Sequence, residues 1–91
     1  DYGMTKSAIQ YLTKYVAATY GKDGIRSNAV VYGGVLKGHE KDFQDAYGKY
    51  SMLGRMTDPG EVGAPLAFLA SDAARGMTGH LMAVDGGFSS W

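Results

Sequence analysis

The stretch that decides the fold is "DPGEVGAPLAFLASDAARGMTGHLMAVDGG", residues 58–87. Asp58 can cap a helix, Pro59 suits the first helical position, and Glu61 stands three residues after the cap. We expect this helix to run to about Ala70. Pro65 lies within it, at a position that allows a local kink. The residues expected on or near its buried side are Val62, Pro65, Leu66 and Leu69.

Two β-rich runs flank this helix. "IRSNAVV" (25–31) is predicted to be a strand, and "GHLMAVDGG" (79–87) is predicted to be a second, buried strand that ends in a tight turn. A strand–helix–strand unit of this length implies parallel strands joined by a right-handed crossover. Parallel strands are normally covered on both faces and belong to larger sheets, so we expect further strands to come from elsewhere.

Two more helices are predicted towards the N-terminus. Residues 2–20 carry apolar side chains at helical spacing, and residues 40–50 suit a short helix. The apolar positions of the first are Met4, Ala8, Ile9, Leu12, Val16 and Ala17. The predicted order is therefore helix, strand, helix, helix, strand, which is an α/β arrangement that is incomplete as a stand-alone fold.

Composition narrows the class of protein. The 91 residues carry nine basic and nine acidic side chains, which argues against nucleic acid or an anionic membrane surface as a partner. No apolar run approaches the about 20 residues that span a bilayer, and there is no cysteine, so we expect a cytoplasmic protein. No metal site is expected, because neither His39 nor His80 has a second ligand at suitable spacing.

Tyr2 and Lys6 form a Tyr-x-x-x-Lys pair on one face of the first predicted helix. The ordinary interpretation is a tyrosine ring that packs on a lysine stem. The functional interpretation is that the ammonium lowers the pKa of the phenol from about 10, so that the phenol exchanges a proton with a substrate oxygen. The pair alone does not decide between the two.

The neighbouring motifs add to that pair. Tyr-x-x-x-Lys, Gly-Ile-Arg-x-Asn-Ala-Val, Pro-x-Glu-Val, Phe-Leu-Ala-Ser-Asp, Thr-Gly and Val-Asp-Gly-Gly occur in this order. In order and spacing the chain resembles the C-terminal half of the short-chain dehydrogenase/reductase family, over essentially its whole length. The resemblance implies the C-terminal part of a Rossmann-like doubly wound parallel sheet. It also implies that residues 1–91 are one partial domain, with a substrate lid over residues 36–57, and that the cofactor is NAD or NADP.

The resemblance assigns roles to particular residues. Tyr2 would be the general acid/base, and Lys6 would hold the nicotinamide ribose and keep the phenol acidic. Tyr32, Gly33 and Val35 match the loop that lines the nicotinamide. Tyr32 stands where the family usually has proline, so this loop is expected to lose rigidity.

Other matches are less specific. Asn28 matches a strand residue for which a structural role is at least as good, and Lys37 replaces a common threonine, which puts one cofactor contact in doubt. In the lid, Phe43, Tyr47 and Tyr50 either face the substrate or pack the lid down. The turn that in the family shapes the sheet end and subunit contacts matches Asp85, Gly86 and Gly87.

Three functional hypotheses remain at this point. The chain contains no glycine-rich phosphate turn and no serine at the family's catalytic position, so we expect the first half of the fold to lie outside it. The first hypothesis is a fragment of an NAD(P)-dependent oxidoreductase, inactive alone, that transfers hydride between nicotinamide and an alcohol or ketone carbon of a small molecule. The second is a non-catalytic module that forms a homo-oligomer. The third is a half that complements a separate N-terminal chain. The substrate and the choice between NAD and NADP stay open.

Overall fold

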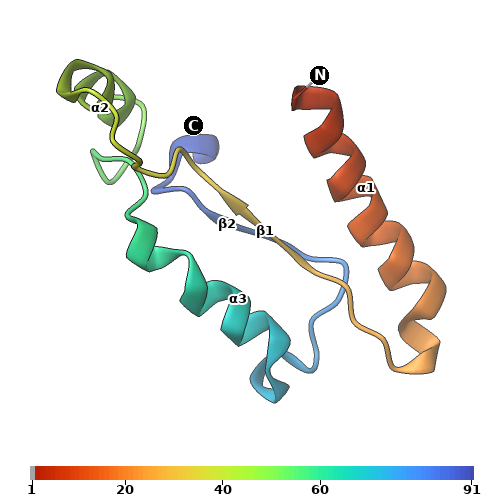
Figure 1. The fold of residues 1–91 in the computed structure, drawn as a ribbon. Helices are drawn as coiled ribbons and strands as arrows, with labels where there is room; N and C mark the ends of the chain where they lie inside the picture. Colours follow the sequence, from red (N-terminus) through yellow and green to blue (C-terminus); the bar gives the residue numbers. More distant parts are fainter. Residues whose placement is uncertain (1) are drawn as a thin grey trace. The chain divides into compact units, whose positions relative to one another are not determined.

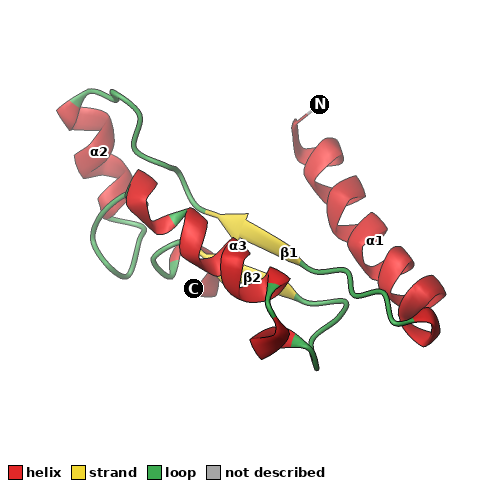
Figure 2. Cartoon of the chain, turned by 60° about the horizontal axis from the view of Figure 1, so that its bottom comes forward, coloured by secondary structure: helices red, strands yellow, loops and turns green. Residues whose placement is uncertain are grey.

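The computed structural model describes residues 2–91, with the side chain of Tyr2 left out. Its helices and strands are α1 (Tyr2–Tyr20), β1 (Ala29–Tyr32), α2 (Lys41–Gly48), α3 (Gly63–Ala70) and β2 (Leu81–Val84) (Figure 1). The predicted order of helix, strand, helix, helix, strand is confirmed. Figure 2 shows that loops flank the short helix α2 on both sides. Among the described residues, no helix combines the length and the apolar character needed to cross a membrane.

The two strands form one small parallel sheet. At one end the Ala29 N–H donates to the His80 carbonyl at 2.9 Å, and at the other the Gly33 N–H donates to the Val84 carbonyl at 3.2 Å. Both bonds join residues with the same separation in sequence, so the strands run in the same direction. The predicted parallel α/β arrangement is therefore confirmed.

The predicted first strand began too early, because residues 25–28 do not join the ladder. The Asn28 side chain donates to the Met77 carbonyl at 2.9 Å and accepts from the His80 N–H at 3.1 Å. The Ser27 N–H donates to the Thr78 hydroxyl at 3.0 Å. Polar side chains that bond the backbone compete with ladder hydrogen bonds, and here they tie the entry to β1 to the loop before β2. Asn28 thus has a structural role.

The start of the third helix also differs from the prediction. Asp58 and Glu61 form the predicted capping box, but the box begins the short 3-10 helix η2 (Pro59–Glu61), and α3 starts only at Gly63. Pro65 then falls in the first turn of α3, where the backbone N–H has no partner within the helix. A kink is therefore not required. Leu69 is buried as predicted, whereas Leu66 is 50% exposed and was wrongly placed on the buried side.

The described chain divides into two compact units. The first unit joins the helix α1 and the residues up to Ala29 to Phe68–Met82, and the second joins Val30–Ala67 to Ala83–Trp91. The boundary runs through α3 and both strands. Each unit is described by itself below.

Few apolar side chains are fully covered. The buried ones are Ala17, Met56, Leu69 and Ala74. Large apolar side chains that stay exposed on α1 are Met4, Ile9, Tyr11, Leu12, Tyr15 and Tyr20. Apolar surface of this extent is typical of surface that another protein segment covers.

Within the first unit, Arg26 organises the C-terminal end of α3. Its half-buried guanidinium donates to the carbonyls of Leu69 at 3.0 Å, Ser71 at 3.2 Å and Met77 at 3.2 Å. The last carbonyls of a helix have no partners inside it, so Arg26 satisfies one of them, that of Leu69, and its charge complements the helix dipole.

Candidate active site

Helix α1 carries the predicted acid–base pair. Tyr2 begins the helix and Lys6 follows one turn later, so the two positions share a face. Lys6 is exposed. The side chain of Tyr2 lies outside the described residues, so its proximity to the Lys6 ammonium stays a prediction. The helix is held in its unit by buried Thr13 and Ala17 and by a 3.3 Å bond from the Lys14 ammonium to the Gly79 carbonyl.

The loop that follows β1 carries the predicted cofactor contacts Tyr32, Gly33 and Val35, which belong to the second unit. The Thr57 N–H donates to the Gly34 carbonyl, and the Leu36 N–H donates to the Thr57 carbonyl, both at 2.9 Å. These two bonds make an isolated parallel bridge between Val35 and Thr57.

The bridge leaves the backbone of Val35 available to a ligand. In a parallel bridge, the bonds to Thr57 come from the neighbours of Val35, so its own N–H and C=O point the other way. Within residues 2–91, neither of these groups has a hydrogen-bond partner. Val35 is half-buried, and a half-buried donor and acceptor side by side favour a ligand that offers the complementary pair.

Tyr32 stands where the family usually has proline, and its side chain makes a hydrogen bond that proline cannot make. Its hydroxyl donates a hydrogen bond to the carbonyl of Val62, immediately before α3. The loss of rigidity expected at this position follows from the missing proline ring alone. In the structure, the side-chain bond fixes the end of β1 to the residues that start α3.

Tyr47 of α2, one of the three aromatic residues named in the predicted lid, packs against the same loop. The Gly34 N–H donates to its hydroxyl oxygen at 2.5 Å. A Cβ added at Gly34 would lie 2.8 Å from the Tyr47 ring, so the ring lies directly on the glycine. Of the three aromatic residues named in the predicted lid, Tyr47 therefore packs down onto the loop, while Phe43 and Tyr50 are 52% and 63% exposed.

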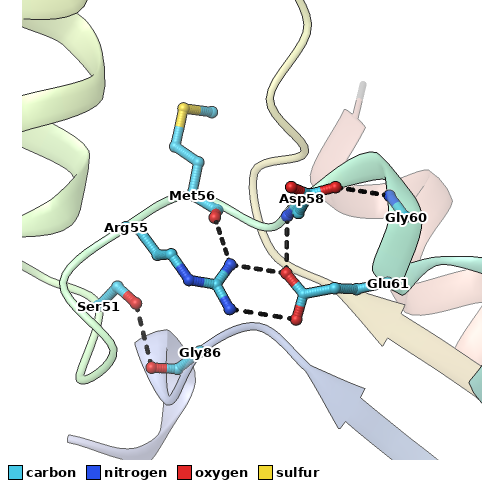
Figure 3. A network of polar contacts seen from close by, with 7 residues as sticks. All are labelled: Ser51, Arg55, Met56, Asp58, Gly60, Glu61 and Gly86. Atoms are coloured by element: carbon cyan, nitrogen blue, oxygen red, sulfur yellow. Dashed lines mark hydrogen bonds and ion pairs between the residues drawn. The ribbon is translucent and has the colours of Figure 1, made fainter.

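A polar network closes the C-terminal end of the predicted lid (Figure 3). Arg55 bonds both carboxylate oxygens of Glu61, at 2.6 and 3.3 Å, and the Asp58 N–H donates to the same carboxylate at 2.8 Å. The bond from Arg55 and then that from Asp58 lower the pKa of the Glu61 carboxyl, and the bond to Glu61 raises the pKa of Arg55. A cavity of about 520 Å³ lies against this network, with Leu36 and Gln44 also lining it.

The turn after β2 contacts the segment predicted to form the lid. Gly86 and Gly87 have φ values of +64° and +85°, which favour glycine. The Gly86 carbonyl accepts from the Ser51 hydroxyl at 3.0 Å (Figure 3). It also accepts from the Leu53 N–H at 3.0 Å. A Cβ at Gly86 would lie 2.5 Å from the Ser51 oxygen, so the close approach also needs glycine.

Asp85 holds this turn together. Its carboxylate accepts from the Ser89 hydroxyl at 2.5 Å, from the Gly87 N–H at 2.9 Å and from the Ser89 N–H at 3.1 Å. The Ser89 hydroxyl contributes most to holding the pKa of the Asp85 carboxyl below its ordinary value. The role of this residue in the chain is therefore to cap the turn. Among the described residues, no group of three or more His, Asp or Glu side chains is arranged to hold a metal ion.

Comparison with known proteins places the chain in a family. A family model described as enoyl-(acyl carrier protein) reductase matches residues 1–89. A cis-4-hydroxycyclohexanecarboxylate dehydrogenase of Sinomonas cyclohexanicum is 38% identical over 94 residues, which cover 99% of this chain and 38% of the relative. The L-tagatose-forming galactitol 2-dehydrogenase of Cereibacter sphaeroides is 36% identical over 97 residues, which cover 100% of this chain and 38% of the relative.

Solved structures agree. A short-chain dehydrogenase of Leptospira borgpetersenii with bound NAD+ superposes with a TM-score of 0.92 at 36% identity, over 97% of this chain and 35% of that one. The chain thus spans well under half the length of the relatives it matches. Its order of elements, its parallel strands and these matches agree on one conclusion: the chain belongs to the short-chain dehydrogenase/reductase family.

Proposed function

We propose that this chain is the C-terminal part of an NAD(P)-dependent oxidoreductase that acts on a small alcohol or carbonyl substrate. The observation that carries the proposal is the family match through residues 1–89, with Tyr2 and Lys6 one turn apart at the start of α1. Residues 1–91 would form one partial domain, and residues 36–57 would form its substrate lid. Two relatives named as dehydrogenases of hydroxylated small molecules support this substrate class.

The loop after β1 fits a nicotinamide. A carboxamide presents one acceptor and N–H donors, which complement the N–H and C=O that Val35 leaves without a partner in residues 2–91. Tyr32 and Gly33 would shape the wall of this site, since both are fixed by hydrogen bonds within the second unit. The NAD+ bound to the Leptospira relative supports a nicotinamide dinucleotide as the ligand class. When bound, the dinucleotide would supply the hydride chemistry.

The residues of α1 would handle the proton. The Tyr2 phenol would give a proton to the substrate oxygen during reduction and take one during oxidation. The Lys6 ammonium would favour the ionised phenol by its positive charge and would donate hydrogen bonds to ribose hydroxyls. Both roles need the dinucleotide and the substrate oxygen to be held within hydrogen-bond reach of these side chains.

A comparison of two polypeptides tests this function. One is the 91-residue chain, and the other is the complete translation product that contains it. Each is mixed with NAD+ or NADP+ and a panel of secondary alcohols, and dinucleotide reduction is followed by absorbance. We expect turnover from the complete product and little or none from the 91 residues alone. Robust reduction by the short chain, or none by the complete product with any alcohol, would contradict the proposal.

A second candidate function rests on the exposed apolar side of α1. Tyr11 and Tyr15 stack with ring centroids 6.4 Å apart and are both exposed, next to exposed Leu12. Such a surface favours association with a second copy or with a complementing N-terminal half. Sedimentation of the 91-residue chain is the test. A concentration-dependent dimer supports the self-associating module, and a monomer at high concentration argues against it.

A further inference from the structure

We propose that Tyr47 is a positioning residue that couples the lid segment to the loop that would hold the nicotinamide. The inference rests on the proposed function for the identity of the ligand. Its structural basis is independent of that function and lies in the contacts of Tyr47, which occupies the last turn of α2.

Tyr47 faces the loop with both its hydroxyl and its ring. The hydroxyl oxygen accepts from the Gly34 N–H at 2.5 Å, and the ring lies where any side chain at Gly34 would be. A Cβ at Gly33 would come within 3.0 Å of the same hydroxyl. These two glycines immediately precede Val35, whose backbone offers the donor and acceptor pair. A shift of Tyr47 therefore changes the loop next to the proposed carboxamide contacts.

Residues of the C-terminal segment also pack against Tyr47. The Phe88 ring stacks on the Tyr47 ring with centroids 4.7 Å apart and planes 23° apart. Phe88 follows the turn that Asp85 caps. The Tyr50 ring contacts the Phe88 ring edge-on, with ring centroids 6.4 Å apart. The indole N–H of Trp91 also donates to the Tyr50 carbonyl. Tyr47 thus ties α2 to both the glycine loop and the C-terminal segment, and α2 cannot move away without breaking the bond to Gly34.

These contacts couple the position of α2 to the conformation of the loop at Gly34 and Val35, so that the two change together. With α2 docked, the Gly34 N–H is paired and the backbone around Val35 is fixed for its ligand. With α2 displaced, Gly34 loses its partner and the loop samples other conformations. The apparent dinucleotide affinity then falls in proportion to the fraction of molecules that keep α2 docked. Tyr47 touches neither the substrate nor the reacting atoms in this account, because it acts through Gly34 and Val35.

The test compares Tyr47→Phe with the matched control Tyr50→Phe. Tyr47→Phe keeps the ring that stacks on Phe88 and removes only the hydroxyl that accepts from Gly34. In residues 2–91 the Tyr50 hydroxyl makes no hydrogen bond, although its ring also contacts Phe88. Loss of one hydrogen bond should accelerate amide exchange at Gly34 about fivefold and weaken NADH or NADPH binding by about the same factor. Exchange is measured by NMR and binding by titration, both on the complete translation product.

A second variant tests the same coupling in case Tyr47→Phe does not fold. Phe88→Leu leaves the hydroxyl in place and removes the supporting ring, and it should also accelerate exchange at Gly34. Unchanged Gly34 exchange in both variants would overturn the inference. So would faster exchange with dinucleotide affinity equal to that of Tyr50→Phe. If the parent protein binds neither dinucleotide, the proposed function itself fails, which is a different result from parent binding that Tyr47→Phe leaves untouched.

Discussion

Arg26 gives the sharpest stability prediction, because one side chain satisfies three carbonyls. Its guanidinium bonds Leu69, Ser71 and Met77 at 3.0 to 3.2 Å, at the C-terminal end of α3 and in the loop before β2. A methionine of similar length keeps part of the stem packing and removes every donor. The substitution Arg26→Met should therefore isolate the hydrogen-bonding contribution.

The expected loss follows from those contacts. A hydrogen bond to a charged group contributes about 1.5 to 3 kcal/mol, and partial exposure of Arg26 lets water replace some of the lost bonds. We expect Arg26→Met to lower the free energy of unfolding by about 3 kcal/mol. The variants are made in the complete translation product, and the midpoint of its unfolding in urea should fall in proportion to this loss.

Arg75→Met is the matched control. Arg75 is exposed, and in residues 2–91 its side chain makes no hydrogen bond, so its replacement should change stability by less than about 0.5 kcal/mol. Both variants are unfolded in urea and followed by far-ultraviolet circular dichroism. A loss below about 1 kcal/mol for Arg26→Met, or equal losses for the two variants, would refute the role given to Arg26.

Two further predictions concern backbone crowding and acid. Gly34→Ala should destabilise by about 1 to 3 kcal/mol in thermal unfolding, because its Cβ would meet the Tyr47 ring at 2.8 Å, whereas Gly63→Ala meets nothing within 4 Å and should be tolerated. Equal melting temperatures for the two variants would contradict the crowding. The folded state lowers the pKa of the Asp85 carboxyl, so its ionised form stabilises the fold at any pH above the ordinary carboxyl pKa of about 3.9. This stabilisation is lost as the pH falls through the pKa of the folded state. Ser89→Ala should raise that pKa in a carboxyl NMR titration and Ser90→Ala should not, and the idea fails if both leave it unchanged.

Local patterns were enough to predict the elements and their direction. The apolar spacing of residues 2–20 predicted α1 to its last residue, and the strand–helix–strand order predicted parallel pairing. The capping residues Asp58 and Glu61 were also identified, because a cap depends only on neighbours along the chain.

Contacts between distant segments could not be predicted in the same way. The strand β1 starts late because the Asn28 side chain bonds residues about 50 positions away. The sequence leaves the role of Tyr47 open, because its ring contacts Gly34 and Phe88 and no local pattern indicates either contact. Tyr32 likewise gains its anchor from Val62, which residue spacing does not reveal.

The most direct test of the central claim is hydride transfer by a Tyr2→Phe variant of the complete translation product. Tyr11→Phe, on the exposed side of the same helix, is the control. We expect Tyr2→Phe to lower kcat at least about 100-fold, since it removes the proton donor, while dinucleotide affinity stays within about twofold and Tyr11→Phe retains activity. Undiminished turnover by Tyr2→Phe would contradict the account.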